Sequence, residues 1–256
     1  MKTVIITNAG ISSRFNRGVP ERDVCLKAIY HTKDPKDTLL YHMLEKCDFA
    51  QRIVLVGGYR YEELQTYVNE MLPREYSCRM EMVYNPYFEK LSSGYSLYLG
   101  LKHALSVPEV EEIVFIEGDL DFDRASFDRV VASTKSVVTW NPTPIYADKA
   151  VVLYQNGEGA LRYAFNASHG LLNLEEPFSG IFHSGQVWKF TDMDILRDTV
   201  EHFGEGKMDG TNLVLIGDYL DRIPQEEVEL VGFADWTNCN TREDFAAIEA
   251  GWRKDE

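Results

Sequence analysis

The sequence lacks several features that would assign a function class directly. It contains neither the GxxxxGK(S/T) pattern of a P-loop nor the GxGxxG pattern of dinucleotide-binding folds. Its four cysteines, Cys25, Cys47, Cys78 and Cys239, form no CxxC pair and no Cys/His spacing suited to zinc. We therefore expect free buried thiols in a reducing compartment. No apolar run approaches the roughly 20 residues that span a bilayer, and no signal-peptide pattern precedes the first strand, which predicts a cytoplasmic protein without a membrane partner.

Positive charge is scarce as well. Lys and Arg total 26 against 41 Asp and Glu, which gives a formal net charge of -15 at pH 7. Proteins that bind nucleic acids or anionic membranes gain most of their affinity from basic surfaces, so this balance predicts neither kind of partner. Phosphate ligands stay compatible with an acidic chain, because one pocket can be locally basic or a divalent metal can bridge protein and phosphate.

Hydrophobic patterning indicates one α/β domain, since 256 residues with 45% hydrophobic content suffice for a large packed core. Strands are expected at 3–7, 52–56, 79–84 and 113–116, and helices at 39–47, 61–71 and 95–105. This alternation predicts a single Rossmann-like domain whose mainly parallel mixed sheet carries helices on both faces. Further strands at 149–154, 160–165 and 180–188 predict a small β-hairpin region. Helices at 192–203, 213–221 and 242–252 and a strand at 228–232 complete the expected elements.

The first expected strand ends in a turn of small residues, Asn8-Ala9-Gly10-Ile11-Ser12-Ser13, which is followed by Arg14. Open parallel sheets bind ligands at the carboxyl ends of their strands, and such a turn leaves backbone N–H groups free for anionic oxygens or a base edge. The Arg14 guanidinium suits phosphate, and Lys27 lies downstream. An ordinary turn flanked by two solvated cations would show the same residues, so both interpretations stay open.

Two carboxylates follow a central strand in Glu117-Gly118-Asp119-Leu120-Asp121. Mg²⁺ binds one or two carboxylates and fills its other positions with water and phosphate oxygens, which Asp119 and Asp121 could serve. The alternative is a turn with helix-capping Asp residues. Near the C-terminal end of the sequence, Asn238 and Asn240 precede Thr241 and Asp244, whose spacing resembles a capping box at a helix start.

Together these motifs resemble the NTP-transferase family of sugar-nucleotide pyrophosphorylases and related cytidylyltransferases, and most resemble its small bacterial CTP:phosphocholine cytidylyltransferases. The motifs that carry the resemblance are, in chain order, the first loop with Arg14, Lys27, Val56-Gly57-Gly58-Tyr59, Asn85-Pro86-Tyr87, Ser92-Ser93-Gly94-Tyr95-Ser96-Leu97, Gly118-Asp119 and Asn240-Thr241-Arg242-Glu243-Asp244. They span most of the chain, although residues 140–225 match only in outline. The resemblance implies one nucleotidyltransferase domain over 1–256, with a nucleotide-binding half at 1–139, an acceptor-binding half at 140–225 and a closing strand and helix at 226–256.

The implied reaction moves a nucleoside monophosphate, CMP from CTP, onto a small phosphorylated acceptor such as phosphocholine and releases pyrophosphate. The implied catalytic residues are Arg14 and Lys27, which would neutralise phosphate charge. The implied nucleotide-binding residues are Asn8, Ala9, Gly10, Ser12, Ser13, Gly58, Tyr59, Ser92 and Ser93. Mg²⁺ is the implied cofactor, and its ligands would be Asp119, Asp121 and Asn240. Aromatic faces that could hold a cationic acceptor are Trp140, Tyr146, Phe178 and Trp188.

Three residues depart from the family pattern: Asn8 in the first loop, Ser92 where Asn is common, and Asn240 where a carboxylate often stands. The changes at Asn8 and Ser92 would permit a non-catalytic nucleotide-binding regulatory module. A second alternative is a metal-dependent glycosyltransferase with a similar nucleotide-binding sheet, in which Asp119 and Asp121 would form the nucleotide-sugar metal site. Arg14 and Lys27 argue against the glycosyltransferase, because that class donates from a diphosphate and lacks this loop. The sequence leaves open whether the chain forms a homodimer.

Overall fold

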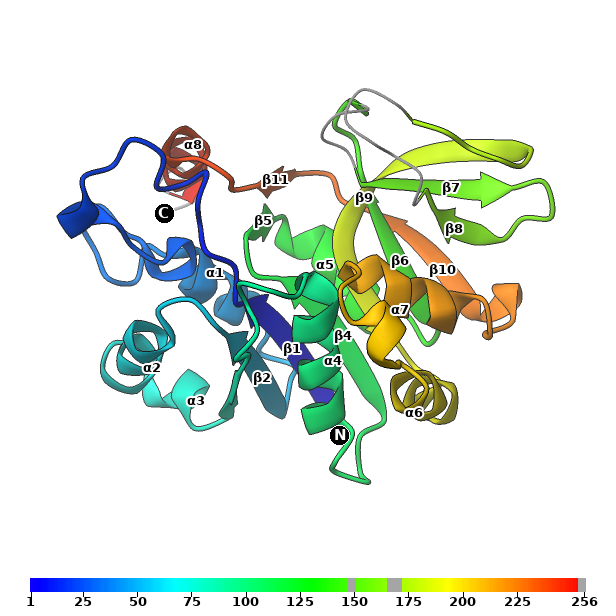
Figure 1. The fold of residues 1–256 in the computed structure, drawn as a ribbon, viewed down its shortest axis with the longest axis horizontal. Coiled ribbons are helices and arrows are strands. Elements are labelled where there is room, and N and C mark those ends of the chain that lie inside the picture. The colour runs from blue at the N-terminus through cyan, green and yellow to red at the C-terminus, as the bar shows by residue number, and fades with distance from the viewer. Residues whose placement is uncertain (147–150, 165–171, 253–256) are drawn as a thin grey trace.

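A computed structural model describes residues 1–146, 151–164 and 172–252. The main sheet contains β1 (Lys2–Asn8), β2 (Arg52–Gly57), β3 (Met80–Tyr84), β4 (Glu112–Glu117), β6 (Ser136–Asn141), β7 (Val152–Asn156), β8 (Leu161–Tyr163), β9 (Phe178–Phe190) and β10 (Val228–Gly232). Its order is β10-β6-β9-β4-β1-β2-β3, and β7 and β8 extend it beside β9 (Figure 1). Strands β1, β2, β3 and β4 pair in parallel, whereas β9 is antiparallel to β4 and β6.

The helices are α1 (Leu39–Lys46), α2 (Tyr61–Glu70), α3 (Arg74–Ser77), α4 (Ser93–Ala104), α5 (Arg124–Ala132), α6 (Met193–Glu201), α7 (Asn212–Leu220) and α8 (Arg242–Trp252). Short 3-10 helices cover Glu21–Asp23, Lys27–Ile29, Glu205–Lys207 and Gln225–Glu227. A second, two-stranded sheet pairs β5 (Leu120–Phe122) with β11 (Trp236–Asn238) in antiparallel fashion. The sequence did not predict this small sheet, and it brings the C-terminal segment against the end of β4.

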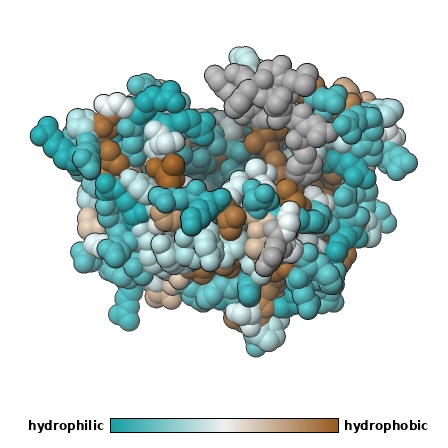
Figure 2. Space-filling view, in the orientation of Figure 1, coloured by the Kyte–Doolittle hydropathy of each residue, from teal (hydrophilic) through white to brown (hydrophobic). Residues whose placement is uncertain are grey.

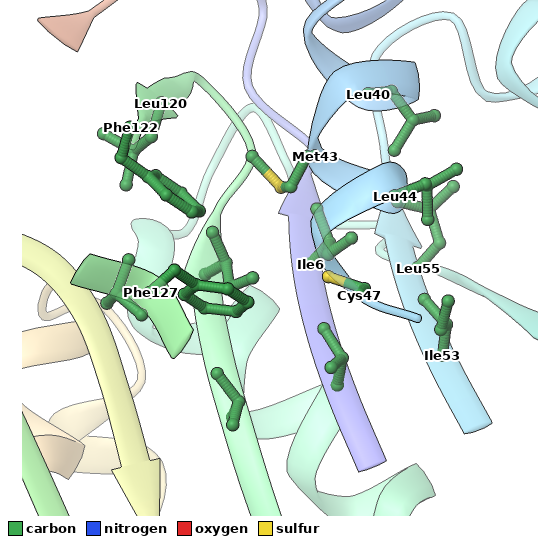
Figure 3. Packing of buried hydrophobic residues seen from close by; sticks show 14 of the residues in the cluster. Ile6, Leu40, Met43, Leu44, Cys47, Ile53, Leu55, Leu120, Phe122 and Phe127 are labelled. Carbon is green, nitrogen blue, oxygen red and sulfur yellow. The ribbon is translucent and has the colours of Figure 1, made fainter. Parts of the chain in front are cut away.

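The core lies on both faces of the sheet because the central strands are apolar at consecutive positions, which is typical of parallel strands covered on both sides. On one face, Ile6 of β1 packs in a cluster with Leu40 and Leu44 of α1 and with residues of α2 and α5 (Figure 3). On the other face, the adjacent Ile5 belongs to a cluster with residues of α4, α6 and α7, among them Leu101. The predicted fold class, an α/β mixed sheet with helices on both faces, is therefore confirmed.

Several expected elements have shifted boundaries. The strand expected at 180–188 is the longer β9, and the strands expected at 149–154 and 160–165 correspond to β7 and β8. Residues 149, 150 and 165 of those two expected strands lie outside the described residues. Cys47 and Cys239 are buried free thiols as expected, but Cys78 is exposed and Cys25 is half-buried. Within the described ranges, no helix combines the length and the apolar character that a membrane crossing needs.

The edge of the sheet at β3 carries a charged cluster with a testable pH dependence. The buried Arg52 side chain donates two hydrogen bonds of 2.6 Å to the Glu81 carboxylate, and His103 Nε2 lies 2.6 Å from Glu81 Oε2. The hydrogen bonds from Arg52, followed by the contact with His103, lower the pKa of Glu81 to about 2. A carboxyl whose pKa is lower in the folded state stabilises the fold above its unfolded pKa, and loses that contribution as pH falls through the folded pKa.

We expect the wild type to lose stability relative to a Glu81→Gln variant between pH 5 and pH 2. At pH 7 the variant should be the less stable protein, because Arg52 would keep a neutral partner in place of a carboxylate. Urea unfolding of both proteins across this range measures the difference. A stability difference that does not change with pH would show that Glu81 titrates normally.

Candidate active site

A cavity of about 230 Å³ opens at the carboxyl ends of β1 and β4, beside the first residues of α4. Figure 2 shows the surface hollowed at this edge of the sheet, between the part of the molecule that carries α8 and the strands β7 and β9. The predicted site residues that line the cavity are Asn8, Ala9, Gly10, Ser12, Lys27, Ser92, Ser93 and Asp119. The topology brings them together because β1 and β4 are parallel neighbours, with Thr7 beside Glu117, so that their ends share one edge.

Further lining residues were missing from the predicted set; Asn85, Phe88, Leu91, Ser96 and Glu117 are among them. The Nδ2 atom of Asn85 donates a 2.9 Å hydrogen bond to Ser96 Oγ, and both side chains are buried. Asn85 and Ser96 stand in motifs that carried the family resemblance. A motif alone does not show which of its side chains face the cavity. For Glu117, its position directly before Gly118 was the single feature of the sequence that could have indicated a place in the site.

Lys27 links three segments of the chain at the cavity. Its Nζ donates hydrogen bonds to Asp119 Oδ2 at 2.9 Å and to the carbonyl oxygen of Cys239 at 2.6 Å. Its backbone N–H lies 3.3 Å from Ser12 Oγ in the first loop. The side chains of Lys27 and Asp119 are only 15% and 25% exposed, so their attraction is screened less than that of a surface pair.

Backbone conformation at Ser12 adds to this arrangement. Ser12 has a φ of 54°, in the left-handed region that costs energy for any residue with a side chain. The same holds for Gln186, with a φ of 55°, whose Oε1 accepts a 3.0 Å hydrogen bond from Asn238 Nδ2. Strained backbone of this kind concentrates at functional sites. Here Ser12 contacts the Lys27 backbone directly, and Gln186 is connected to Asp119 through Asn238.

The structure places Asn238, not Asn240, beside Asp119. Asn238 Nδ2 lies 3.4 Å from Asp119 Oδ1, and the N–H of Cys239 donates to the Asp119 carbonyl at 2.8 Å. Asn238 lies here because β11 pairs with β5 in a register that sets Asn238 opposite Leu120. Asn240 instead follows the strand, and its backbone N–H donates to Asp244 in the cap of α8. The structure therefore brings Asn238 next to Asp119 in place of the predicted Asn240, and a metal-binding role for either asparagine stays a prediction.

Asp121 does not share a site with Asp119. Its Oδ1 lies 3.2 Å from Lys46 Nζ of α1, and it is absent from the cavity lining. Gly118 and Asp119 form a turn between β4 and β5, so the two carboxylates lose the common direction that residues two apart would have in one strand. The structure does not support the prediction that Asp121 shares a metal site with Asp119, because Asp121 lies outside the cavity lining and pairs with Lys46 of a neighbouring helix.

Four other predicted residues lie outside the cavity lining. Arg14 and Ser13 are exposed on the first loop, and Arg14 forms no ion pair with another described residue. Gly58 packs under the loop, since a Cβ there would lie 2.6 Å from Phe88 Cβ and 2.9 Å from the Ala9 carbonyl. The N–H of Tyr59 donates to that same carbonyl at 3.2 Å. Gly58 and Tyr59 therefore support the loop from below, and a catalytic role for Arg14 stays a prediction.

The four aromatic residues predicted to bind an acceptor do not line the cavity. Trp188 is only 1% exposed, stacks on Phe115 at 5.1 Å between ring centroids, and donates from Nε1 to the Tyr163 hydroxyl. Trp188 is therefore a core residue, and its prediction as an acceptor ligand is wrong. Tyr146 and Phe178 are exposed, and Trp140 is half-buried against Phe182. Whether those three contact an acceptor stays a prediction.

The absence of a side chain at Gly118 determines how Asn8 sits in the cavity wall. A Cβ atom at Gly118 would lie 1.9 Å from Asn8 Oδ1 and 2.7 Å from the Thr7 carbonyl oxygen. Gly118→Ala must therefore push Asn8 or the end of β1 aside, and we expect a loss of about 1–3 kcal/mol in the free energy of unfolding. Urea unfolding measures it. Gly251→Ala in α8, where a Cβ would meet nothing within 4 Å, is the control and should be neutral or stabilising. Equal stabilities of Gly118→Ala and wild type would disprove this close approach.

The residues around Asp119 fit a magnesium ion whose remaining coordination positions are filled by substrate phosphates and water. Asp119 lines the cavity and offers carboxylate oxygens, and Asn238, whose Nδ2 lies 3.4 Å from Asp119 Oδ1, has its own Oδ1 buried without a hydrogen-bond partner. Mg²⁺ is typically held by one or two carboxylates together with substrate phosphates, which needs no complete protein cage. No group of three or more His, Cys, Asp or Glu side chains able to hold a metal occurs in the described part of the chain.

Burial and the neighbouring charge of Asp119 raise the pKa of the Glu117 carboxyl. Two carboxyl groups thus stand in one cavity with Lys27 as the nearby cation. Added positive charge would stabilise both in their ionised forms.

Comparison with protein families gives a match over residues 23–252 to the family described as "Domain of unknown function (DUF6564)". The chain belongs to this family. A comparison with curated proteins finds no match. The family description itself carries no activity, so the architecture and the cavity remain the basis for a functional assignment.

Solved structures show that this DUF6564 protein shares its fold with known nucleotidyltransferases. The inositol-1-phosphate CTP transferase from T. maritima has a TM-score of 0.64 and 18% identity, with 95% of this chain and 91% of that chain covered. The CTP:phosphocholine cytidylyltransferase from Streptococcus pneumoniae has a TM-score of 0.62 and 14% identity, with 97% and 98% covered. A UDP-glucose pyrophosphorylase complexed with UDP-glucose has a TM-score of 0.66 and 13% identity, with both chains fully covered at 100%. At these identities the likeness shows a common fold.

Proposed function

We propose that the chain is a Mg²⁺-dependent nucleotidyltransferase. It transfers a nucleoside monophosphate from an NTP to a small phosphorylated acceptor and releases pyrophosphate. The observation that carries the proposal is the hydrogen-bonded pair of Lys27 Nζ and Asp119 Oδ2, 2.9 Å apart in a cavity that the first loop also lines. A cation and a metal-binding carboxylate at the carboxyl ends of parallel strands suit a substrate with several phosphates.

The proposed chemistry needs no general base. A phosphate monoester has its second pKa near 6, so the acceptor is already ionised near pH 7 and can attack the α-phosphorus directly. The obstacle is repulsion between two anions, and Lys27 is placed to reduce it because its ammonium group is fixed by Asp119 and the Cys239 carbonyl. Catalysis then rests on positioning and electrostatic stabilisation.

The first loop and the start of α4 would hold the nucleotide. A Cβ at Gly10 would meet nothing within 4 Å, so the loop backbone is open to a ligand. Ser92 and Ser93 bring the N-terminus of α4 to the cavity, where the positive end of the helix dipole favours polar or anionic groups. Asp119 and Asn238 would hold Mg²⁺, which when bound would offset phosphate charge between donor and acceptor. In the finer form of the proposal the nucleotide is CTP, supported by the motif resemblance and not by a contact to a base.

A pyrophosphate-release assay tests the reaction. Each of the four NTPs is incubated with Mg²⁺ and one of several acceptors: phosphocholine, an aminoalkylphosphonate, glucose 1-phosphate or inositol 1-phosphate. We expect acceptor-dependent pyrophosphate release, greatest with CTP. Consumption of a nucleotide sugar without pyrophosphate would instead indicate a glycosyltransferase. Binding of an NTP without turnover on any acceptor would indicate a non-catalytic module.

Thermal-shift titration separates the choice of base from the reaction. A ligand at 100 times its Kd stabilises a protein by about 2.7 kcal/mol, which is readily detected as a rise in melting temperature. We expect CTP with Mg²⁺ to give the largest rise among the four NTPs. A larger rise with UTP or ATP would reject the assignment of CTP while leaving nucleotidyl transfer intact.

A further inference from the structure

Glu117 and Asn212 form a polar pair at the cavity that the proposed phosphate chemistry does not use. Asn212, the first residue of α7, is 3% exposed, and its Nδ2 donates a 2.6 Å hydrogen bond to Glu117 Oε1. The backbone N–H of Asn212 donates to Ser93 Oγ at 3.1 Å, and Ser93 Oγ lies 3.4 Å from Asn212 Oδ1. The Glu117 carboxylate is therefore held in one orientation by the adjoining starts of α4 and α7.

The cavity wall leaves one acceptor without a partner among the described residues. Glu117 lines the cavity, and its Oε2 accepts no hydrogen bond from any described residue. On the adjacent strand, Asn8 lines the same cavity and is 8% exposed, although its Nδ2 is itself buried without a partner. A fixed acceptor that faces a cavity without a protein partner suits a polar ligand that donates to it.

The surroundings of Glu117 select the class of that ligand. An ionised Glu117 would repel phosphate, so it suits a part of the substrates that carries no negative charge. A quaternary ammonium group would need aromatic faces around it, but Phe88 is the single aromatic side chain among the described residues of the lining. Small polar side chains, Ser92, Ser93 and Ser96, line the cavity instead. A fixed carboxylate among such residues suits a hydroxyl donor, as carboxylates that bind ribose hydroxyls do in other nucleotide-binding sheets.

We propose that Glu117, held by Asn212, is a specificity residue that accepts a hydrogen bond from a hydroxyl group of a bound sugar or polyol ring. This inference rests on the proposed nucleotidyl transfer. The hydroxyl belongs either to the ribose of the NTP or to a hydroxylated acceptor phosphate, and the two sources are separable by experiment.

Calorimetric titration without acceptor tests the ribose. The wild type is titrated, in Mg²⁺, with the four NTPs and with their 2′-deoxy and 3′-deoxy forms. The wild type should bind one ribonucleotide about tenfold more tightly than one of its deoxy forms, the effect of one hydrogen bond to a charged acceptor. Glu117→Gln should reduce that ratio to near one, because it weakens the binding of the ribonucleotide. Asn212→Ala should reduce the ratio only partly, because it frees the Glu117 side chain to change its orientation. Glu81→Gln, outside the cavity, is the matched control and should keep the wild-type ratio.

The acceptor is tested by pyrophosphate release with glucose 1-phosphate, inositol 1-phosphate and phosphocholine. If the hydroxyl is on the acceptor, Glu117→Gln lowers kcat/KM about tenfold for the hydroxylated phosphates and leaves the value for phosphocholine unchanged. Thermal unfolding of each variant confirms that it is folded at the assay temperature. NTP binding with an unchanged ribose-to-deoxyribose ratio, together with unchanged acceptor selectivity in both variants, would overturn this inference alone. Failure of every NTP to bind the wild type would overturn the proposed function and this inference with it.

Discussion

Asp119→Ala is expected to lower kcat/KM for pyrophosphate release by at least about 10²–10³-fold while the protein stays folded. The carboxylate is the partner of Lys27 and the single predicted metal ligand that the structure keeps in the cavity lining. Its side chain lies on a turn and is 25% exposed, so its removal leaves no large void in the core. Pyrophosphate release over a range of Mg²⁺ concentrations, together with thermal unfolding, measures both effects.

Asp121→Ala is the matched control for Asp119→Ala. Asp121 lies only two residues away, carries the same charge and has a similar exposure of 24%, but its partner is Lys46. We expect Asp121→Ala to change kcat/KM by less than about threefold, and to cost no more than about 1 kcal/mol of stability for its lost ion pair. A folded Asp119→Ala protein with near-normal activity in Mg²⁺ would refute the site. Equal losses in both variants would show that the activity depends on local charge and not on the Asp119 position.

Lys27→Met should reduce kcat/KM by about 10²–10³-fold, because it keeps the apolar stem and removes the charge that would stabilise the transition state. The effect should fall mainly on kcat if Lys27 acts on charge that develops during transfer, and mainly on KM if it only binds the triphosphate. Steady-state kinetics with the best NTP and acceptor pair separates the two. Because Lys27→Met removes the partner of Asp119, binding of the metal ion alone should be tighter or unchanged in this variant. Titration with Mn²⁺ as a paramagnetic probe measures this binding.

Lys46→Met supplies the corresponding control. Lys46 is as little exposed as Lys27, at 15%, and it too pairs with a carboxylate of this region, Asp121. It does not line the cavity, so its loss should leave kcat/KM within about threefold of the wild type. A Lys27→Met protein that also stays within this range, a change below about 1 kcal/mol in activation free energy, would identify Lys27 as a structural cation.

The positions of most strands of the main sheet followed from local patterns, and so did the edge of the sheet where the site lies, whereas β5, β6 and β11 were not predicted. Consecutive apolar residues such as Val4, Ile5 and Ile6 indicated a strand covered on both faces, which they form with 0% exposure. A small-residue loop after β1 and Asp119 after β4 were then expected at one edge, because parallel strands end on the same side. That inference required only alternation and polarity, both of which are properties of neighbouring residues.

Which side chains meet at that edge depended on contacts between distant segments. Asn238 and Asn240 look equivalent in the sequence, since both precede the same helix. The register of β11 on β5 places Asn238 beside Asp119, whereas the backbone N–H of Asn240 donates to Asp244 in the cap of α8. Asp121 was captured by Lys46 of α1, 75 residues away. Asn212 donates a hydrogen bond to Glu117, 95 residues earlier in the chain, and no local sequence pattern predicts this contact.

Sequence alone therefore determined the α/β architecture and the edge of the sheet that bears the cavity, because periodicity and turn chemistry act over a few residues. Tertiary structure decided which polar groups were paired and which were left facing the cavity. In the folded chain Lys27 pairs with Asp119, Asp121 pairs with Lys46, and Trp188 is buried in the core. The physical reason is that pairing and burial depend on which segments pack together, and chain spacing does not encode the distance between residues that lie far apart in the sequence.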